Sequence, residues 1–144
     1  MHAIRHVIRP HRLVTAPPTA SVLEVARIMA DARVGAIPIV EGDRVVGIFS
    51  ERDLMTRIVV EGRDPQRALV MEAMTHDVLT ATPDDTRSEC LQRMREARCR
   101  HLPVLERGRL IAVLSMRDLL RDEIEEQDEE IRHLRAYIQQ APPS

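Results

Sequence analysis

The apolar positions of this chain change their spacing from one segment to the next. Over residues 22–29, apolar side chains recur at helical spacing, which predicts an amphipathic helix. Residues 37–40 and 44–49 are short apolar runs rich in β-branched side chains, and the Glu41-Gly42-Asp43 sequence between them is typical of a hairpin turn. These segments predict a helix followed by an antiparallel pair of strands.

Polar residues and prolines mark where the elements begin. Thr15-Ala16-Pro17-Pro18 is held extended by its prolines, which predicts a short first strand. Ser21 and Glu24 have the spacing of a capping box at the start of the helix. Ser50 follows the second strand of the hairpin and is a good N-cap for a helix that runs towards Val60. The predicted order of elements is therefore β-α-β-β-α.

The same residues return 65 positions later without a gap. The identical pairs span the whole unit: Thr15 and Thr80, Glu24 and Glu89, Met29 and Met94, Pro38 and Pro103, Ser50 and Ser115, Asp53 and Asp118. An ungapped duplication predicts two copies of one structural unit. Because each copy is too short to bury a core alone, we expect the two to pack as a pseudo-twofold pair.

The duplication divides the chain into five parts. A basic, histidine-rich arm covers residues 1–13, the first copy covers 14–60 and a connector covers 61–78. The second copy covers 79–121, and a C-terminal helix and tail cover 122–144. The predicted fold class is α/β (α+β), with two tandem βαββα units and a long C-terminal helix.

The C-terminal helix carries its own apolar stripe. Its members follow heptad spacing, with one glutamine at a seam position: Leu120, Ile124, Gln127, Ile131, Leu134 and Ile138. Between Asp122 and Glu130 there are seven acidic residues and no basic ones, which predicts a solvated acidic face. The stripe packs either on its own module or on a second chain, and the pattern does not choose between these.

Composition disfavours several classes of protein. The net charge is -2 and the only aromatic residues are Phe49 and Tyr137, so the chain lacks both the basic excess and the stacking surfaces of nucleic-acid-binding proteins. No apolar run approaches the ~18 residues of a membrane span, and the N-terminus lacks the apolar core of a secretion signal. Cys90 and Cys99 form no disulfide framework. We expect a cytoplasmic protein whose cysteines are small apolar residues, with a redox role as the alternative.

Motifs for catalysis and for metal binding are missing from the sequence. There is no Gly-rich phosphate loop, and His2, His6 and His11 have no cysteine or carboxylate nearby to complete a metal site. Cys99 and His101 share one face of a predicted strand, but no third group completes a nucleophilic site. We expect no enzymatic activity, no catalytic residue and no metal site, and an arm that packs or moves.

The Ser-x-x-Asp sequence at the end of each copy has two interpretations. Ser50 and Ser115 can cap a helix, while Asp53 and Asp118 reach back to the capping residue and suit the positive end of the helix dipole. The same corner is also a favourable place for an anion. The first interpretation is structural, and the second is a phosphate and sugar site.

The duplicated β-α-β-β-α unit, with its apolar-Pro-apolar strand start and its closing Ser-x-x-Asp, resembles the CBS domain pair, or Bateman module. The resemblance covers about residues 7–121. It implies adenine-nucleotide binding in clefts between the two copies. Ribose would meet the aspartates, phosphate would meet the serines and arginines, and the base would lie near the threonines and the residues around each proline. The implied residues are Thr15, Ala36, Ile37, Pro38, Ser50, Arg52, Asp53, Thr80, Arg100, His101, Leu102, Pro103, Ser115, Arg117 and Asp118.

The two copies differ at positions close to these residues. Gly47 in the first copy is Ala112 in the second, which we expect to make the second backbone less permissive. Gly35-Ala36 in the first copy is Arg100-His101 in the second. We therefore expect two unequal sites, and favour the one nearest Arg100, His101 and Arg117 for phosphate.

The resemblance implies a non-catalytic regulatory module that senses AMP, ADP, ATP or NAD(H), with AMP the favoured ligand and no catalytic cofactor. It also implies a homodimer that signals to an unidentified protein partner. The alternative is a nucleotide-independent interaction module that acts through its C-terminal helix and whose pockets are vestigial.

Overall fold

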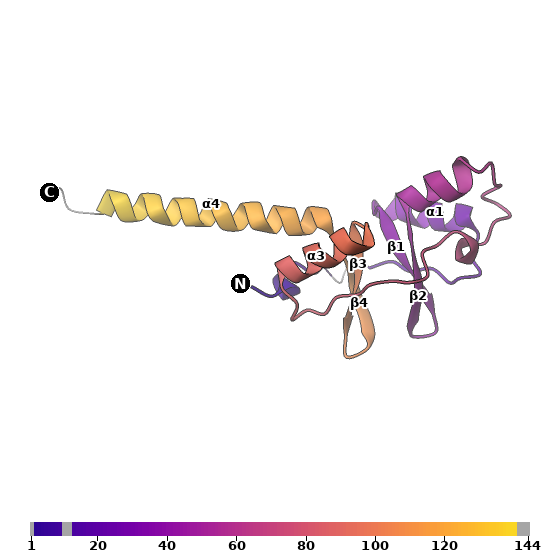
Figure 1. Ribbon diagram of the computed structural model, residues 1–144, viewed down its shortest axis with the longest axis horizontal. Coiled ribbons are helices and arrows are strands. Elements are labelled where there is room, and N and C mark those ends of the chain that lie inside the picture. Colours follow the sequence, from indigo (N-terminus) through magenta and orange to yellow (C-terminus); the bar gives the residue numbers. More distant parts are fainter. Residues whose placement is uncertain (1, 10–12, 141–144) are drawn as a thin grey trace.

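A computed structural model of the protein describes residues 2–9 and 13–140 (Figure 1). The predictions that concern His11 and residues 141–144 lie outside these ranges. The division of the chain into five parts stays a prediction.

The first copy contains the predicted elements in the predicted order. Helix α1 (Val22–Ala32) is followed by the hairpin of β1 (Ala36–Glu41) and β2 (Arg44–Ser50). The next helix begins as α2 (Glu51–Asp53) and continues as the π-helical segment η3 (Leu54–Val59). The main chain is thus helical from Glu51 to Val59, as expected for a helix that Ser50 caps and that runs towards Val60.

The second copy repeats this order and then extends it. It contains α3 (Arg87–Ala97), β3 (His101–Glu106) and β4 (Arg109–Ser115), and ends in the long helix α4 (Met116–Gln140). The predicted fold class is confirmed: two small antiparallel sheets, each with its helices, and a long C-terminal helix (Figure 1).

Each hairpin has the same register and the same irregularity. Pro38 lies opposite Ile48, and the register shifts immediately after Ile39. Pro103 lies opposite Val113 in the second hairpin, with the shift after Val104. The predicted first strands exist only as single parallel bridges, in which Ala16 pairs with Ile39 and Ala81 pairs with Val104.

The helices begin and end as their capping residues dictate. The Ser21 hydroxyl accepts a hydrogen bond from the Glu24 amide at 3.1 Å. At Thr86 the capping box is complete, because the Glu89 side chain also accepts from the Thr86 amide. Arg33 and Arg98 end the two helices in the left-handed conformation, with φ of 57° and 53°.

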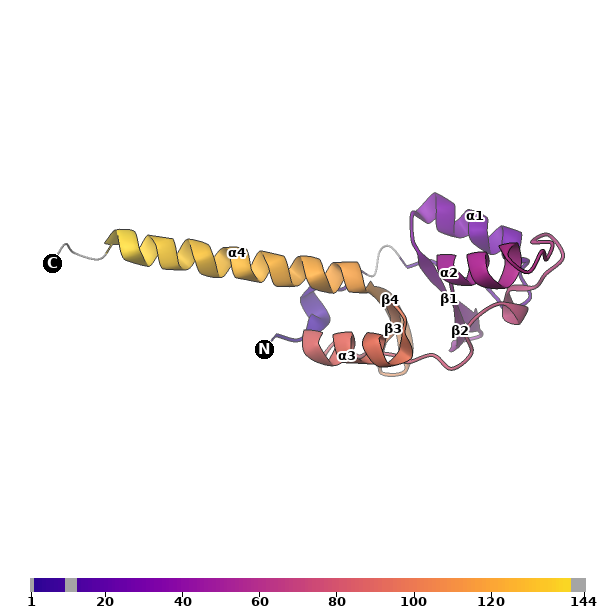
Figure 2. The same ribbon diagram turned by 45° about the horizontal axis from the view of Figure 1, so that its top comes forward.

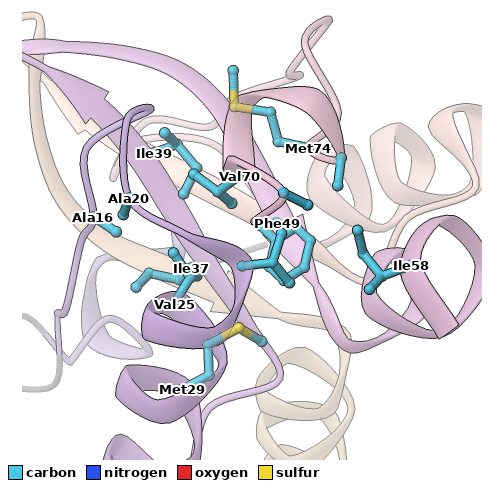
Figure 3. Close-up of a cluster of buried hydrophobic side chains, with 13 residues drawn as sticks. Ala16, Ala20, Val25, Met29, Ile37, Ile39, Phe49, Ile58, Val70 and Met74 are labelled. Carbon is cyan, nitrogen blue, oxygen red and sulfur yellow. The ribbon is translucent and has the colours of Figure 1, made fainter. Parts of the chain in front are cut away.

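The structure has two apolar cores, one in each copy. The first is centred on Phe49, Ile37 and Val25 and is shown in Figure 3. The second contains Met94 and Leu102. We expected each copy to be too short to bury a core alone, and the two copies do not share a single core. Each copy has its own core, but each core is completed by a segment from outside the β-α-β-β-α unit.

The connector completes the first core. Its short helix η4 (Val70–Glu72) places Val70 in the core, and the Val70 amide donates to the Ala20 carbonyl at 2.8 Å. The Val22 amide in turn donates to the Ala68 carbonyl at 2.9 Å. The connector is therefore an edge of the first copy as well as a link between the copies.

The N-terminal arm does the same for the second copy. Its helix η1 (Ile4–His6) buries Ile4 in the second core, and the Ile4 amide donates to the Asp85 carbonyl at 2.9 Å. Ala3 bridges to Thr86, as Leu69 bridges to Ser21. The arm therefore packs against the body of the protein, which was one of the two expected outcomes. It packs on the second copy, although the first copy is nearer in the sequence.

Helix α4 leaves the body of the protein after its first turns. Leu119 is buried in the second core, but the helix then extends well beyond both copies (Figures 1 and 2). Its apolar stripe is exposed, which excludes packing of that stripe on its own module. Within the described ranges, no helix is both long enough and apolar enough to span a membrane.

Candidate functional site

The corner at the end of β2 is closed by its own residues. Asp53 Oδ2 accepts from the Ser50 amide at 2.9 Å and from the Ser50 hydroxyl at 3.0 Å. The Ser50 hydroxyl oxygen accepts from the Asp53 amide at 3.2 Å. The other carboxylate oxygen, Oδ1, lies 3.7 Å from Arg57 Nε, and Asp53 is only 8% exposed. Both carboxylate oxygens and the serine proton are therefore engaged within the copy.

The corresponding corner at the end of β4 is more open. Asp118 Oδ2 accepts from the Ser115 amide at 3.1 Å, and the Ser115 hydroxyl oxygen accepts from the Asp118 amide at 3.0 Å. In the part of the chain that the structure describes, neither Asp118 Oδ1 nor the Ser115 hydroxyl proton has a further partner. Asp118 is half-buried and lines a small cavity of about 70 Å³ beneath the N-terminal arm, together with His6, Val7, Arg9 and Arg121.

The residue four positions after each aspartate accounts for the difference between the two Oδ1 atoms. Residues four apart meet on one side of a helix, so Arg57 neutralises Asp53. The equivalent residue in the second copy is Asp122, which cannot pair with Asp118. Asp122 instead lies 2.8 Å from His6 Nε2 and 3.0 Å from Arg87 Nη1, and thus joins the arm and α3 to α4.

His101 lies at the boundary between the two copies. It is opposite Ser115 in the β3–β4 hairpin. A Cβ built on Gly35 of the first copy would lie 3.5 Å from the His101 ring and 3.6 Å from the Glu51 carboxyl group. Burial lowers the pKa of His101, and Glu51 and Asp118 oppose this effect without reversing it. The imidazole is therefore mostly neutral near pH 7 and lies within electrostatic range of both helix starts.

The remaining predicted site residues fall into two groups. The side chains of Ile37 and Leu102 are fully buried in the two cores, and Pro38, Pro103 and Ala36 are also buried. A ligand could meet Ile37 and Leu102 only through their main chain.

The polar members of the predicted site lie closer to solvent. Thr80 is half-buried, whereas the others are exposed: Thr15, Arg52, Arg100 and Arg117. Among the described residues, none of these three arginines forms a salt bridge, so their guanidinium groups are available to an anion. The assignment of all these residues to a ligand site stays a prediction.

Gly47 has a different role from the one expected. Its φ is not in the left-handed region, so conformational freedom is not the reason for glycine here. A Cβ at this position would overlap the thioether of Met74, which the connector places against β2. The connector is held there because the Ile48 amide donates to the Thr75 carbonyl at 3.0 Å, and because Arg57 donates to the carbonyls of Ala73 and Met74.

The sequence interpretation missed Arg57, Arg87, His6 and Asp122. The i, i+4 spacing of Asp53 and Arg57 was a usable signal for the first of these. Nothing local could have joined His6 to Asp122, because these residues are 116 positions apart.

The two cysteines fit the apolar interpretation. Both are free thiols, and Cys90 is fully buried in the second core. Burial raises the pKa of Cys90 to about 11 and also raises the pKa of Cys99. Neither thiol is therefore a ready thiolate at neutral pH.

The chain belongs to the CBS domain family. The family model for the CBS domain matches residues 4–60 and again residues 70–125, so each match begins at the short helix that precedes its unit. The chain is 35% identical over 118 residues to the CBS domain-containing protein CBSCBSPB3 of Arabidopsis thaliana. This match covers 81% of the chain but only 21% of the plant protein.

Solved structures agree with this assignment. A protein with CBS domains from Burkholderia ambifaria is 36% identical and has a TM-score of 0.76, over 80% of this chain and 85% of that one. The CBS domain protein PAE2072 from Pyrobaculum aerophilum, solved in complex with AMP, is 30% identical. Its TM-score is 0.73 over 81% of this chain and 88% of that one.

Proposed function

We propose that this protein is a non-catalytic regulatory module that binds an adenosine compound, with AMP the favoured ligand. The observation that carries the proposal is the open corner at Ser115 and Asp118. There, one carboxylate oxygen and one hydroxyl proton have no partner among the described residues, whereas the Ser50–Asp53 corner is closed by Arg57. The AMP complex of the Pyrobaculum relative supports the choice of ligand.

The residues around this corner suit the parts of a nucleotide. Asp118 Oδ1 accepts from the ribose hydroxyls. Ser115, the first N–H groups of α4 and the exposed guanidinium groups of Arg100 and Arg117 bind phosphate. The base lies beside His101, near Thr80 and the main chain of the residues that precede Pro103.

A second, weaker site lies at the first corner. It uses the equivalent residues of the first copy, namely Thr15, Ala36, Ser50, Arg52 and Asp53. For a ligand to bind there, the Asp53 carboxylate must exchange its contact with Arg57 for contacts with ribose. This exchange has a free-energy cost that the second site does not have.

Binding is coupled to signalling through the boundary between the copies. The His101 ring lies close to Gly35 across this boundary, near enough to be within 3.5 Å of a Cβ built there, so a ligand beside His101 touches both copies and stabilises one angle between them. A protein partner that prefers the same angle then binds more tightly. The module acts as a homodimer, as the CBS resemblance implies.

Isothermal titration tests the proposal directly. The protein is titrated with AMP, ATP, NADH and S-adenosylmethionine, and at least one should bind below millimolar concentration. Asp118→Ala should weaken binding by about 1.5–3 kcal/mol, the scale of a hydrogen bond to a charged group. Asp53→Ala is the matched control and should weaken it less. If all four compounds fail to bind, the ligand proposal is wrong; if Asp53→Ala has the larger effect, the choice of corner is wrong.

A nucleotide-independent interaction module is the second candidate, and the exposed apolar stripe of α4 favours it. It predicts association through α4 that is the same with and without an adenine nucleotide. Comparing the affinity of a purified partner for the full chain and for residues 1–121, each with and without AMP, separates the two candidates.

A further inference from the structure

The apolar stripe of α4 has the arrangement of a coiled-coil seam. Isoleucine occupies position a in three successive heptads, and leucine occupies position d on either side of a single glutamine: Ile124, Ile131 and Ile138 at a; Leu120, Gln127 and Leu134 at d. β-Branched residues at a with leucine at d favour a parallel two-stranded coiled coil. The five apolar members are between 45% and 69% exposed.

The seam and the body of the protein lie on opposite sides of α4. The residues that hold the helix to the second copy are Leu119, which is buried in its core, and Asp122 and Glu126, which form salt bridges with Arg87. These residues occupy heptad positions c and f, which point away from a and d. Among the residues that the structure describes, no other element lies beside the outer half of the helix in either view (Figures 1 and 2). Two copies can therefore meet along α4 with both modules on the outside.

We propose that α4 pairs with α4 of a second copy as a parallel coiled coil over residues 120–138. This inference rests on the proposed homodimer and identifies the surface that forms it. A second copy fits because the seam is self-complementary. In parallel register, Gln127 lies opposite Gln127 of the partner subunit, so the two amides can hydrogen-bond to each other. Glu130 at position g then faces Arg135 of the partner subunit at position e.

The opposite orientation matches these groups poorly. An antiparallel pair with its apolar layers aligned places Gln127 against Ile131 of the partner subunit and leaves the amide without a hydrogen-bond partner. It also places Asp128 opposite Asp128 of the partner subunit, and Glu130 opposite Glu130 of the partner subunit. Both contacts bring like charges together. The parallel arrangement has one unfavourable contact, between Glu123 and Asp128 of the partner subunit, and offsets it with the contact between Glu130 and Arg135.

The first experiment compares two substitutions on neighbouring faces of the outer half of α4. Leu134→Lys places a charge in the seam, and Ala136→Lys places the same charge at the exposed position f. Sedimentation equilibrium over a concentration series should give twice the 16.4 kDa of the chain for the unmodified protein and for Ala136→Lys. Leu134→Lys should weaken the dimer at least tenfold, about 1.4 kcal/mol or more. Equal dimer strength in all three proteins, or a monomeric unmodified protein, would overturn the proposal.

The second experiment tests orientation by the sign of its effect. Arg135→Glu turns the contact with Glu130 of the partner subunit into a repulsion, so a parallel dimer weakens by roughly fivefold to tenfold. In an antiparallel dimer Arg135 faces Arg121 of the partner subunit, and the same substitution would tighten it. Glu130→Arg added to Arg135→Glu should restore the parallel dimer. Tightening by Arg135→Glu alone, or no rescue by the double substitution, would overturn the parallel arrangement.

Titration of Leu134→Lys with AMP separates this proposal from the proposed function. The Ser115–Asp118 corner lies at the start of α4 (Met116–Gln140), whereas Leu134 lies in the last turns of the same helix. A monomeric Leu134→Lys variant that binds AMP as the unmodified protein does supports the coiled coil and the ligand site together. A dimer that depends on Leu134 in a protein that binds no adenosine compound would leave the coiled coil standing and reject the ligand site.

Discussion

The two Ser-x-x-Asp corners share their capping geometry and differ in what remains for a ligand. In both, the aspartate accepts from the serine amide and the serine hydroxyl accepts from the aspartate amide. At the first corner Arg57 and the serine proton occupy the remaining acceptor sites, and at the second corner they do not. The comparison shows that a duplicated helix cap can keep its geometry while the side chain four residues later differs: Arg57 pairs with the aspartate in the first copy, and Asp122 cannot do so in the second.

The largest expected effect concerns the segments that complete the two cores. Ile4→Ala removes most of a buried side chain from the second core, and Val70→Ala is the equivalent change in the first. Each should lower the free energy of unfolding by about 2–4 kcal/mol, measured by urea denaturation. Val60→Ala, at an exposed position, is the control and should change it by no more than about 0.5 kcal/mol. An Ile4→Ala effect no larger than the control would show that the arm does not stabilise the second copy.

The next effect concerns the strand position that differs between the copies. Gly47→Ala forces a methyl group against Met74 and should destabilise the protein by about 1–3 kcal/mol. Adding Met74→Ala should remove the overlap, so the double variant should lose less stability than the sum of the two single losses. Ala112→Gly in the second copy should cost only about 0.5–1 kcal/mol. Additive losses in the double variant would exclude the overlap with Met74 as the reason for glycine at position 47.

A single substitution can make the second corner resemble the first. Asp122→Arg places a guanidinium group four residues after Asp118, and should weaken AMP binding by about fivefold to tenfold, or ~1 kcal/mol. Asp122→Asn removes the contacts with His6 and Arg87 without adding a positive charge, and so reports the effect of losing those contacts. Titration calorimetry measures both. Equal affinities in the two variants would show that pairing of the aspartate does not control ligand binding.

The smallest effect is a pH dependence that arises at the boundary between the copies. The pKa of His101 is lowered in the folded protein, so the unfolded chain binds more protons as pH falls below the ordinary value of 6.5. The contribution of His101 to the free energy of unfolding is therefore fully present above that value. It is lost as pH falls towards the folded-state pKa, by no more than about 1.4 kcal/mol per pH unit for one proton. Glu51, Asp118 and Arg100 are the charged groups around the ring, and their effects are already part of this balance. His101→Gln should flatten this part of the stability curve, and an unchanged slope would exclude His101 as its source.

Local features of the fold could be predicted from the sequence, and contacts between distant segments could not. The caps at Ser21 and Thr86 and both hairpins depend on neighbouring residues, so the sequence pattern indicates them directly. The docking of Ile4 on the second copy and of Met74 on Gly47 depends on where the connector and the arm lie in space. The sequence duplication does not reveal these contacts. The residues that repeat begin only after the arm in the first copy and after the connector in the second, so neither docking segment is part of the repeat.

The candidate site was predictable to the same extent. The serines and aspartates follow from their spacing, and the structure places them at helix starts as expected. The spacing of Asp53 and Arg57 was visible, but whether an arginine at this distance folds back onto the carboxylate depends on the connector carbonyls that it also binds. The burial of Ile37 and Leu102 follows from the cores, which a strand pattern alone does not locate.

The docking of the arm on the second copy has a consequence for synthesis of the chain. Ile4 leaves the ribosome long before its partner Asp85, which follows about 80 residues later, or roughly 4–16 s at ~5–20 residues per second. The first copy and its connector are complete within that time, so they can fold while the arm is still unattached. The arm therefore presents an apolar side chain to chaperones and proteases until the second copy emerges. Docking of Ile4 thus waits for a segment that is synthesised about 80 residues later.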